Sequence, residues 1–233
     1  MQADNQPIEP LSINFHNENE SEKNKNLKKP LSIFGVEFIY LALLGIFVAF
    51  LGWVVENAVK LIVNGAIDSR FHFLPFISPY GLIVFAFHIA LNSADNLVIF
   101  GKRIFKTNSK KTKFLSNFIT LFIIYFFVFF GELCVGNLWG EIFGVELWNY
   151  SALPLQVTQY AGLIPTLGYG TGAYLLFKFI YTPALKFVRR KIKFSTAKKI
   201  VVTLGSAIVL DTLFLIFQII FLGNARLLWQ IKF

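Results

Sequence analysis

The chain has 233 residues, of which 55% are hydrophobic, 17% aromatic and only 15% charged. Soluble domains usually carry about a quarter of charged residues, so this composition excludes an ordinary soluble domain and indicates a membrane protein. A single cysteine excludes an intrachain disulfide and a cysteine-based zinc site, and a net charge of +9 calls for an anionic partner or surface.

Residues 1–30 differ in kind from the rest of the chain. They are rich in Asn, Glu and Lys and poor in branched apolar side chains, so they cannot bury enough surface to fold. They lack the apolar core that follows the basic start of a signal peptide. We expect a disordered polar cytoplasmic tail over 1–30 and a single helical transmembrane domain over 31–233.

Five stretches are long and apolar enough for helices that cross a bilayer, which need about 20 residues each. They are 33–55, 79–100, 114–136, 160–182 and 200–222. The fourth departs most from the pattern, because it contains Pro165, Lys178 and several glycines. The sequence thus predicts an all-α, polytopic protein of the cell membrane with five transmembrane helices.

Basic residues mark alternate loops. The tail, the segment 101–113 and the segment 185–199 carry most of the lysines and arginines, whereas 139–159 has none. Because Lys and Arg accumulate on the cytoplasmic side, this places the N-terminus inside and the C-terminus outside. The same residues form a basic collar facing anionic lipid, which accounts for the net charge better than nucleic-acid binding does.

The first and third predicted spans end alike, each on a glutamate near the outer face. Glu56 closes "FLGWVVE" and Glu132 lies in "FVFFGELCVGNLWGE". Each is followed by an outer loop with prolines and a glycine-bearing entry into the next span. This suggests a parallel repeat of helix hairpins, with a fifth helix added, although two hairpins with polar outer loops would look similar without a repeat.

A polar stripe runs along the second predicted span. His88, Asn92, Asp95 and Asn96 follow the spacing of one helical face, and Asp211 in the fifth span could supply the opposite wall. Ionisable groups inside a membrane often mark a functional pathway. The stripe is therefore interpreted as a hydrophilic or proton-linked path, with interhelical hydrogen bonding as the structural alternative.

Metal and nucleotide chemistry find little support. His88 and Asp95 would stand about 10 Å apart along a helix, and neither an HExxH motif nor a phosphate-binding loop occurs. We predict no metal site and no cofactor. The stretch "TLGYG" (166–170) is similar to a potassium-channel filter, but too little apolar sequence follows it. We instead expect Gly168 and Gly172 to form a helix-packing face.

Two outer-loop motifs resemble a known family, the ABC-transporter type IV or CmpB-like permeases. "LPFISPYGL" keeps Pro75, Tyr80 and Gly81 of one signature, and "ELWNYSALPLQ" resembles an element built around Trp148, Asn149, Tyr150 and Ser151. The resemblance extends to "GWVVE", Glu132 and Asp211. This chain departs from the pattern at Leu74, Ser78 and Gln156, and Arg70-Phe71 stands where the family has Arg-Gly.

The resemblance implies a membrane permease or transport subunit. We expect an outward-facing vestibule in which Tyr80, Trp148 and Tyr150 contact a substrate, while Glu56 or Glu132 attracts its positive end. Arg70 is the expected ion-pair partner of Glu56. Aromatic belt residues at the membrane interface are the structural alternative for the three aromatic side chains.

Three functions remain open from the sequence. A permease would need a separate cytoplasmic ATPase subunit for ATP dependence, because this chain has no nucleotide motif. An intramembrane enzyme acting on lipid-linked substrates would use Glu56, Glu132 or Asp95 as acid or base, but no nucleophile–base pair supports it. A non-catalytic membrane assembly subunit is the third. The expected partners are the lipid bilayer and a second copy of the chain in a homo-oligomer.

Overall fold

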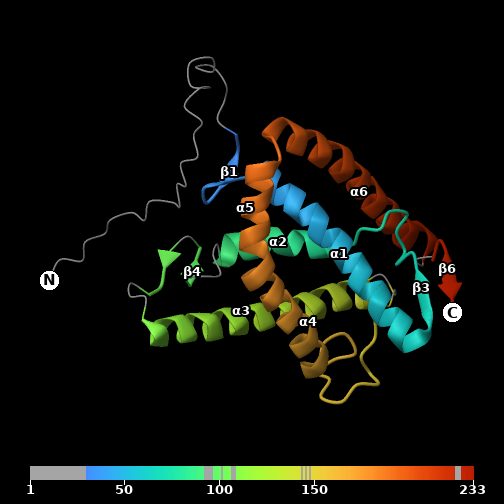
Figure 1. Ribbon diagram of the computed structural model, residues 1–233. Helices are drawn as coiled ribbons and strands as arrows, with labels where there is room; N and C mark the ends of the chain where they lie inside the picture. Colours follow the sequence, from blue (N-terminus) through green and yellow to red (C-terminus); the bar gives the residue numbers. More distant parts are fainter. Residues whose placement is uncertain are drawn as a thin grey trace.

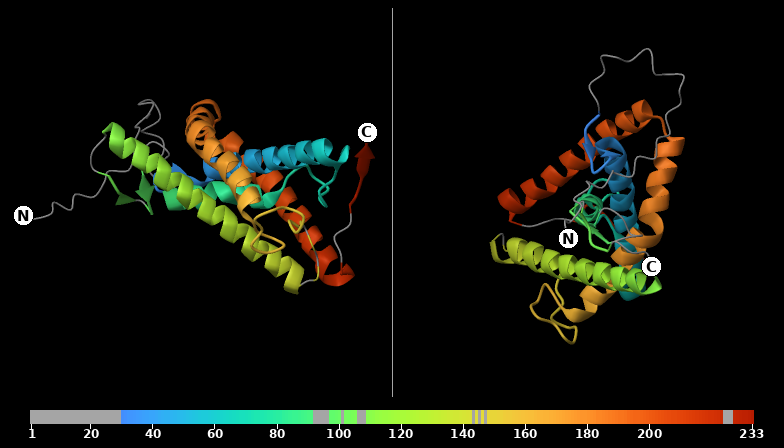
Figure 2. Two further views of the ribbon diagram at one scale, coloured as in Figure 1. Left: turned by 90° about the horizontal axis from the view of Figure 1, so that it is seen from below. Right: turned by 90° about the vertical axis from the view of Figure 1, so that its left-hand side faces the viewer.

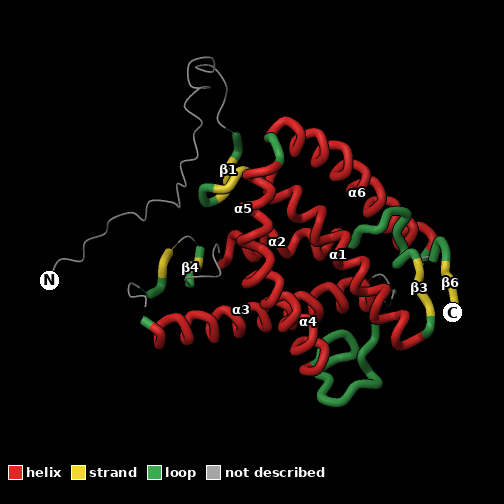
Figure 3. Tube along the Cα trace, in the orientation of Figure 1, coloured by secondary structure: helices red, strands yellow, loops and turns green. Residues whose placement is uncertain are grey.

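A computed structural model describes residues 30–91, 97–100, 102–105, 109–142, 144, 146, 148–223 and 227–233. This part of the chain is mostly helical, with three small two-stranded sheets (Figures 1 and 3). The all-α fold class predicted from composition is therefore confirmed. The predicted tail, apart from Pro30, lies outside the described residues.

Helix α1 (Phe38–Asn64) is the central element. It packs against α2 (Ser78–Leu91) and α6 (Phe194–Leu222). On the side of α1 opposite α6 lies the rod formed by α4 (Leu163–Leu175) and α5 (Thr182–Lys191) (Figures 1 and 2). A short hairpin, β1 (Ser32–Ile33) and β2 (Val36–Glu37), precedes it. The helix continues two turns beyond the predicted end at residue 55 and stops at Gly65, whose φ of 60° suits a left-handed C-cap.

Helix α2 is shorter than the predicted span 79–100. It ends at Leu91, and the chain then forms a second hairpin of β4 (Val98–Ile99) and β5 (Lys102–Arg103). Helices α1 and α2 approach each other closely at Gly81. A Cβ on this residue would lie 2.7 Å from the carbonyl oxygen of Gly45. Glycine at this position therefore permits the helix contact, in line with its place in the "PYG" motif.

Helix α3 (Lys110–Asn137) passes into a π-helical turn, Leu138–Ile142. A long loop then leads to α4 (Leu163–Leu175), which runs through a π-helical stretch, Leu176–Tyr181, into α5 (Thr182–Lys191) (Figure 3). Most of the predicted fourth span thus belongs to a longer rod, 163–191, that includes the first part of the basic segment after it. "TLGYG" lies inside α4, so its carbonyls form helical bonds and not a filter.

The chain ends beside α1. Strand β6 (Gln230–Lys232) pairs antiparallel with β3 (Ala66–Asp68), the strand that directly follows α1. Figure 1 shows both strands next to the end of α6. This pairing ties the C-terminal segment to the loop that carries Arg70 and Pro75.

Three helical stretches within the described residues are long and apolar enough to cross a membrane: Phe38–Asn64, Lys110–Glu141 and Phe194–Leu222. Large apolar side chains on them face outward, as Phe126 and Leu210 do with exposed fractions of 58% and 66%. Such surfaces are stable in contact with lipid. The molecule is therefore a helical membrane protein. Five spans, the inside N-terminus and the hairpin repeat stay predictions.

Candidate functional site

Glu56 is the centre of the first half of the site. Its Oε1 accepts a hydrogen bond from the Tyr80 hydroxyl at 2.5 Å, and its Oε2 accepts one from Arg70 Nη2 at 2.9 Å. Tyr80 reaches it because Gly52, one turn earlier on α1, has no side chain. A Cβ there would lie 2.5 Å from the Tyr80 ring. The "GWVVE" motif thus provides the glycine against which the Tyr80 ring packs and the glutamate that accepts the hydrogen bond of its hydroxyl.

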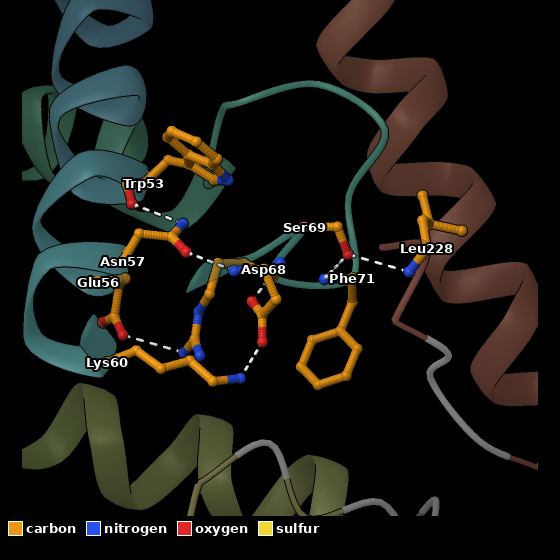
Figure 4. A network of polar contacts seen from close by, with 9 residues as sticks. Trp53, Glu56, Asn57, Lys60, Asp68, Ser69, Phe71 and Leu228 are labelled. Atoms are coloured by element: carbon orange, nitrogen blue, oxygen red, sulfur yellow. Dashed lines mark hydrogen bonds and ion pairs between the residues drawn. The ribbon is translucent and has the colours of Figure 1, made fainter. Parts of the chain in front are cut away.

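A polar network positions Arg70. The backbone N–H of Arg70 donates to Asp68 Oδ1 at 2.8 Å, and Asp68 is fully buried. Asn57 Oδ1 accepts from the Asp68 N–H at 2.7 Å, and Lys60 donates to the Asp68 carboxylate. Figure 4 shows Asn57 and Lys60 of α1 pointing toward Asp68. The loop after α1 therefore folds back over its own helix.

Glu132, on α3, is the centre of the second half. The Tyr150 hydroxyl donates to its Oε1 at 3.0 Å. Burial raises the pKa of Tyr150 well above its usual range, with the Glu132 charge as a second cause, so the phenol keeps its proton and acts as a donor. The two halves share one pattern, a glutamate late in a long helix bonded by a tyrosine from the segment that follows.

The "WNYS" segment holds Tyr150 in place. Trp148 Nε1 donates to the Tyr160 carbonyl at 2.9 Å, and Asn149 Oδ1 accepts from the Ser151 N–H at 2.8 Å. Tyr160 packs against the last turns of α3, where a Cβ on Gly136 would lie 2.3 Å from its Cβ. Trp148, Asn149 and Ser151 therefore shape the loop.

The two halves interact electrostatically. The charges of Glu56 and Glu132 act on each other, and both carboxylates act on the Tyr169 hydroxyl from α4. Tyr80 also interacts electrostatically with Tyr150 and Tyr169. We call this group the carboxylate cluster; its members are Glu56, Arg70, Tyr80, Glu132, Tyr150 and Tyr169. The sequence analysis did not predict Tyr169 as a site residue. It lies within "TLGYG", which was interpreted through the spacing of its glycines.

The carboxylate cluster is not fully paired. It holds two carboxyl groups against one guanidinium. Within the described part of the chain, Glu132 Oε2 and Arg70 Nε are buried without a hydrogen-bond partner. Buried polar atoms normally find partners, so Glu132 Oε2 leaves an acceptor for a polar or cationic ligand, and Arg70 Nε leaves a donor for a polar one.

Asp211 does not lie opposite His88. From α6, its two carboxylate oxygens accept hydrogen bonds from the backbone N–H groups of Phe73 at 2.9 Å and Leu74 at 3.1 Å. Its Oδ2 lies 3.4 Å from His72 Nδ1. Asp211 therefore anchors the loop between β3 and α2, the same loop that carries Arg70 and, further on, Pro75.

His88 belongs to a separate polar contact near the other end of α2. Its Nε2 lies 2.8 Å from the Ile33 carbonyl, and its Nδ1 lies 2.5 Å from the Tyr181 hydroxyl. These bonds join the first hairpin, α2 and the α4–α5 rod, which favours the structural interpretation of His88. Asn92, Asp95 and Asn96, the rest of the predicted stripe, lie outside the described residues.

Gly168 and Gly172 do not form the helix-packing face that their spacing predicted. An added Cβ on either would meet no described atom within 4 Å. Gly170 makes the close contact, because a Cβ there would lie 2.3 Å from the Tyr125 ring. The Tyr125 hydroxyl also lies 2.9 Å from Thr171 Oγ1. The face that meets α3 is thus rotated away from the predicted pair.

Fold and site together define a polytopic helical membrane protein with a polar, tyrosine-rich cluster between its helices. The family described as "Putative ABC-transporter type IV" matches residues 43–216, well over half of the chain. The chain belongs to this family, as the motifs around Tyr80 and Tyr150 predicted. Searches of curated proteins and of solved structures found no match.

Proposed function

We propose that this protein is a membrane permease or transport subunit in which the carboxylate cluster binds the positively charged group of a substrate. The family and the long apolar helices support a membrane protein related to transport. The observation that carries the finer proposal is the electrostatic interaction of Glu56 with Glu132, which come from helices far apart in sequence, beside three tyrosines and an unpartnered Glu132 Oε2.

The cluster's chemistry suits an organic cation. Two carboxyl groups outnumber the single guanidinium, so the site favours positive charge. Tyr80, Tyr150 and Tyr169 add hydroxyl groups and aromatic surface, which attracts cations in partly desolvated sites. In the predicted orientation the cluster faces outward, because it lies near the loops that carry few basic residues. Arg70, held by Glu56, then positions one carboxylate and leaves Glu132 for the substrate.

Thermal unfolding of the purified full chain tests the binding site. The probes are methylammonium, tetramethylammonium, guanidinium and Mg²⁺, each added as its chloride salt, with NaCl as the ionic-strength control. We expect saturable stabilisation by at least one organic cation, because ligands that bind only the folded state raise the melting temperature. Glu132→Gln removes the effect, whereas Glu146→Gln, an exposed outer-loop glutamate that contacts Asn149, keeps it. Equal responses in all three proteins would overturn the proposed site.

A separate experiment addresses energy coupling. Tagged protein is isolated from its native membrane in mild detergent, and co-purifying proteins are quantified by mass spectrometry. A nucleotide-hydrolysing subunit near equal stoichiometry, retained by Glu132→Gln, identifies the membrane half of an ATP-driven transporter. A preparation without an ATPase rejects that coupling. Stoichiometric recovery of a partner that has no ATPase, together with no cation response, identifies an assembly subunit instead.

A further inference from the structure

An apolar cavity of about 450 Å³ lies at the far end of α2 from the carboxylate cluster. Its lining includes Ala90 and Leu91 of α2, Ile99 and Phe100 of the second hairpin, and Phe122 and Phe126 of α3. Figure 1 shows β4 next to the end of α2 and above the first half of α3. Tyr80 and Ala90 are ten residues apart on α2, or about 15 Å at the usual helical rise, so the two sites are distinct.

The cavity opens onto a ridge of phenylalanines on α3. Five of them recur every four residues and all are exposed: Phe114, Phe118, Phe122, Phe126 and Phe130. Neighbouring rings pack together, with centroids 4.8 Å apart for Phe118 and Phe122 and 4.3 Å apart for Phe126 and Phe130. Phe122 and Phe126 belong to both the ridge and the cavity wall, so the apolar surface runs from the lipid-facing side into the cavity.

The basic end of α3 lies next to this apolar surface. Lys110, Lys111 and Lys113 are exposed in its first turns, and Lys102 is exposed on β5 beside Ile99. Lys113 precedes Phe122 by nine residues, which is about 13 Å along the helix. The sequence has no acidic residue between Leu97 and Gly131, so nothing in this stretch neutralises the lysines.

We propose that this cavity holds an acyl chain of an anionic phospholipid whose headgroup lies against Lys102, Lys110, Lys111 and Lys113. The chain is retained because a wholly apolar wall favours hydrocarbon over water. The lysines select the headgroup, because cationic residues at a membrane surface attract anionic lipid. The apolar cavity and the neighbouring lysines are arranged like the acyl chain and the headgroup of a phospholipid. This inference does not depend on the proposed transport function.

Native mass spectrometry of the full chain tests the headgroup. Protein purified in detergent is given equimolar phosphatidylglycerol and phosphatidylcholine, and retained lipid is counted. We expect a preference for phosphatidylglycerol that falls about fivefold for each lysine removed in Lys110→Gln/Lys111→Gln. The matched control, Lys198→Gln/Lys199→Gln in the second turn of α6, keeps the preference. Equal losses in both double variants would mean general electrostatic attraction and would overturn the site.

The cavity is tested by filling it. Ile123→Trp adds an indole to the wall and lowers retention of phosphatidylglycerol to the level of the lysine variant, whereas Leu115→Trp, on an exposed face of α3 outside the lining, leaves it unchanged. Near-identical melting temperatures of the two tryptophan variants confirm that both are folded. Unchanged retention in a folded Ile123→Trp protein would overturn the proposal. So would a stable dimer that covers the ridge and binds no phospholipid.

Discussion

Arg70 and Glu56 form an ion pair with Nη2 2.9 Å from Oε2, across a loop whose backbone is itself bonded to Asp68. Both side chains are mostly buried, with exposed fractions of 24% and 16%. The pair thus joins the second half of α1 to the loop that leads into α2. It also fixes the orientation of one of the two carboxylates in the carboxylate cluster.

Removing one partner of this pair destabilises the protein more than removing both. We expect Arg70→Gln to lower the free energy of unfolding by about 1–3 kcal/mol, between the values for exposed and buried pairs, because Glu56 loses its counter-charge. Glu56→Gln/Arg70→Gln recovers part of the loss. Denaturant titration in detergent, analysed as a double-mutant cycle, measures the coupling. Additive effects would show that the pair contributes nothing to folding.

Phe71 adopts a left-handed backbone with φ of 68°, at the position where the family motif has glycine. L-residues in this region are strained by about 1–2 kcal/mol. Phe71→Gly should therefore be more stable than Phe71→Ala by about 1 kcal/mol, since both lose the ring and only glycine relieves the strain. Thermal unfolding of the two variants measures the difference. An alanine variant as stable as the glycine variant would contradict it.

His72 should make the fold sensitive to acid. Burial lowers the pKa of His72 below its ordinary value of 6.5, although the Asp211 carboxylate raises it in part. The unfolded chain then binds the proton more readily than the folded chain, so stability is full above about pH 6.5 and falls as the pH drops below that value. His72→Gln should flatten this part of the profile. Melting temperatures of the natural chain and of the variant between pH 5 and 8 check it, and equally steep profiles would contradict it.

Two glycines on α4 should respond in opposite ways to the same substitution. Gly170→Ala places a Cβ against the Tyr125 ring and should cost about 1–3 kcal/mol through overpacking. Gly168→Ala meets open space and should gain about 0.5–1 kcal/mol, because alanine is the better helix former. Unfolding free energies measured in one detergent check both. If Gly168→Ala destabilised the protein, Gly168 would lie in a packed interface, as the spacing of the glycines predicted.

Composition and periodicity were enough to establish a helical membrane protein, because the length and apolarity of a spanning segment are local properties of the chain. The family followed from short motifs around Tyr80 and Tyr150. Chain order also indicated that Glu56 and Arg70 could pair, since one loop joins them. These conclusions require no knowledge of how distant helices pack.

The membership of the carboxylate cluster depended on packing between helices. Tyr169 joins Glu56 and Glu132 because Gly170 lets α4 lie against Tyr125 of α3, and no spacing within α4 encodes that contact. Asp211 was expected opposite His88, but it accepts backbone hydrogen bonds from the loop at Phe73. A one-dimensional pattern shows which side chains share a helix face. Which other segment meets that face depends on side-chain fit across the interface, which brings together residues more than a hundred positions apart.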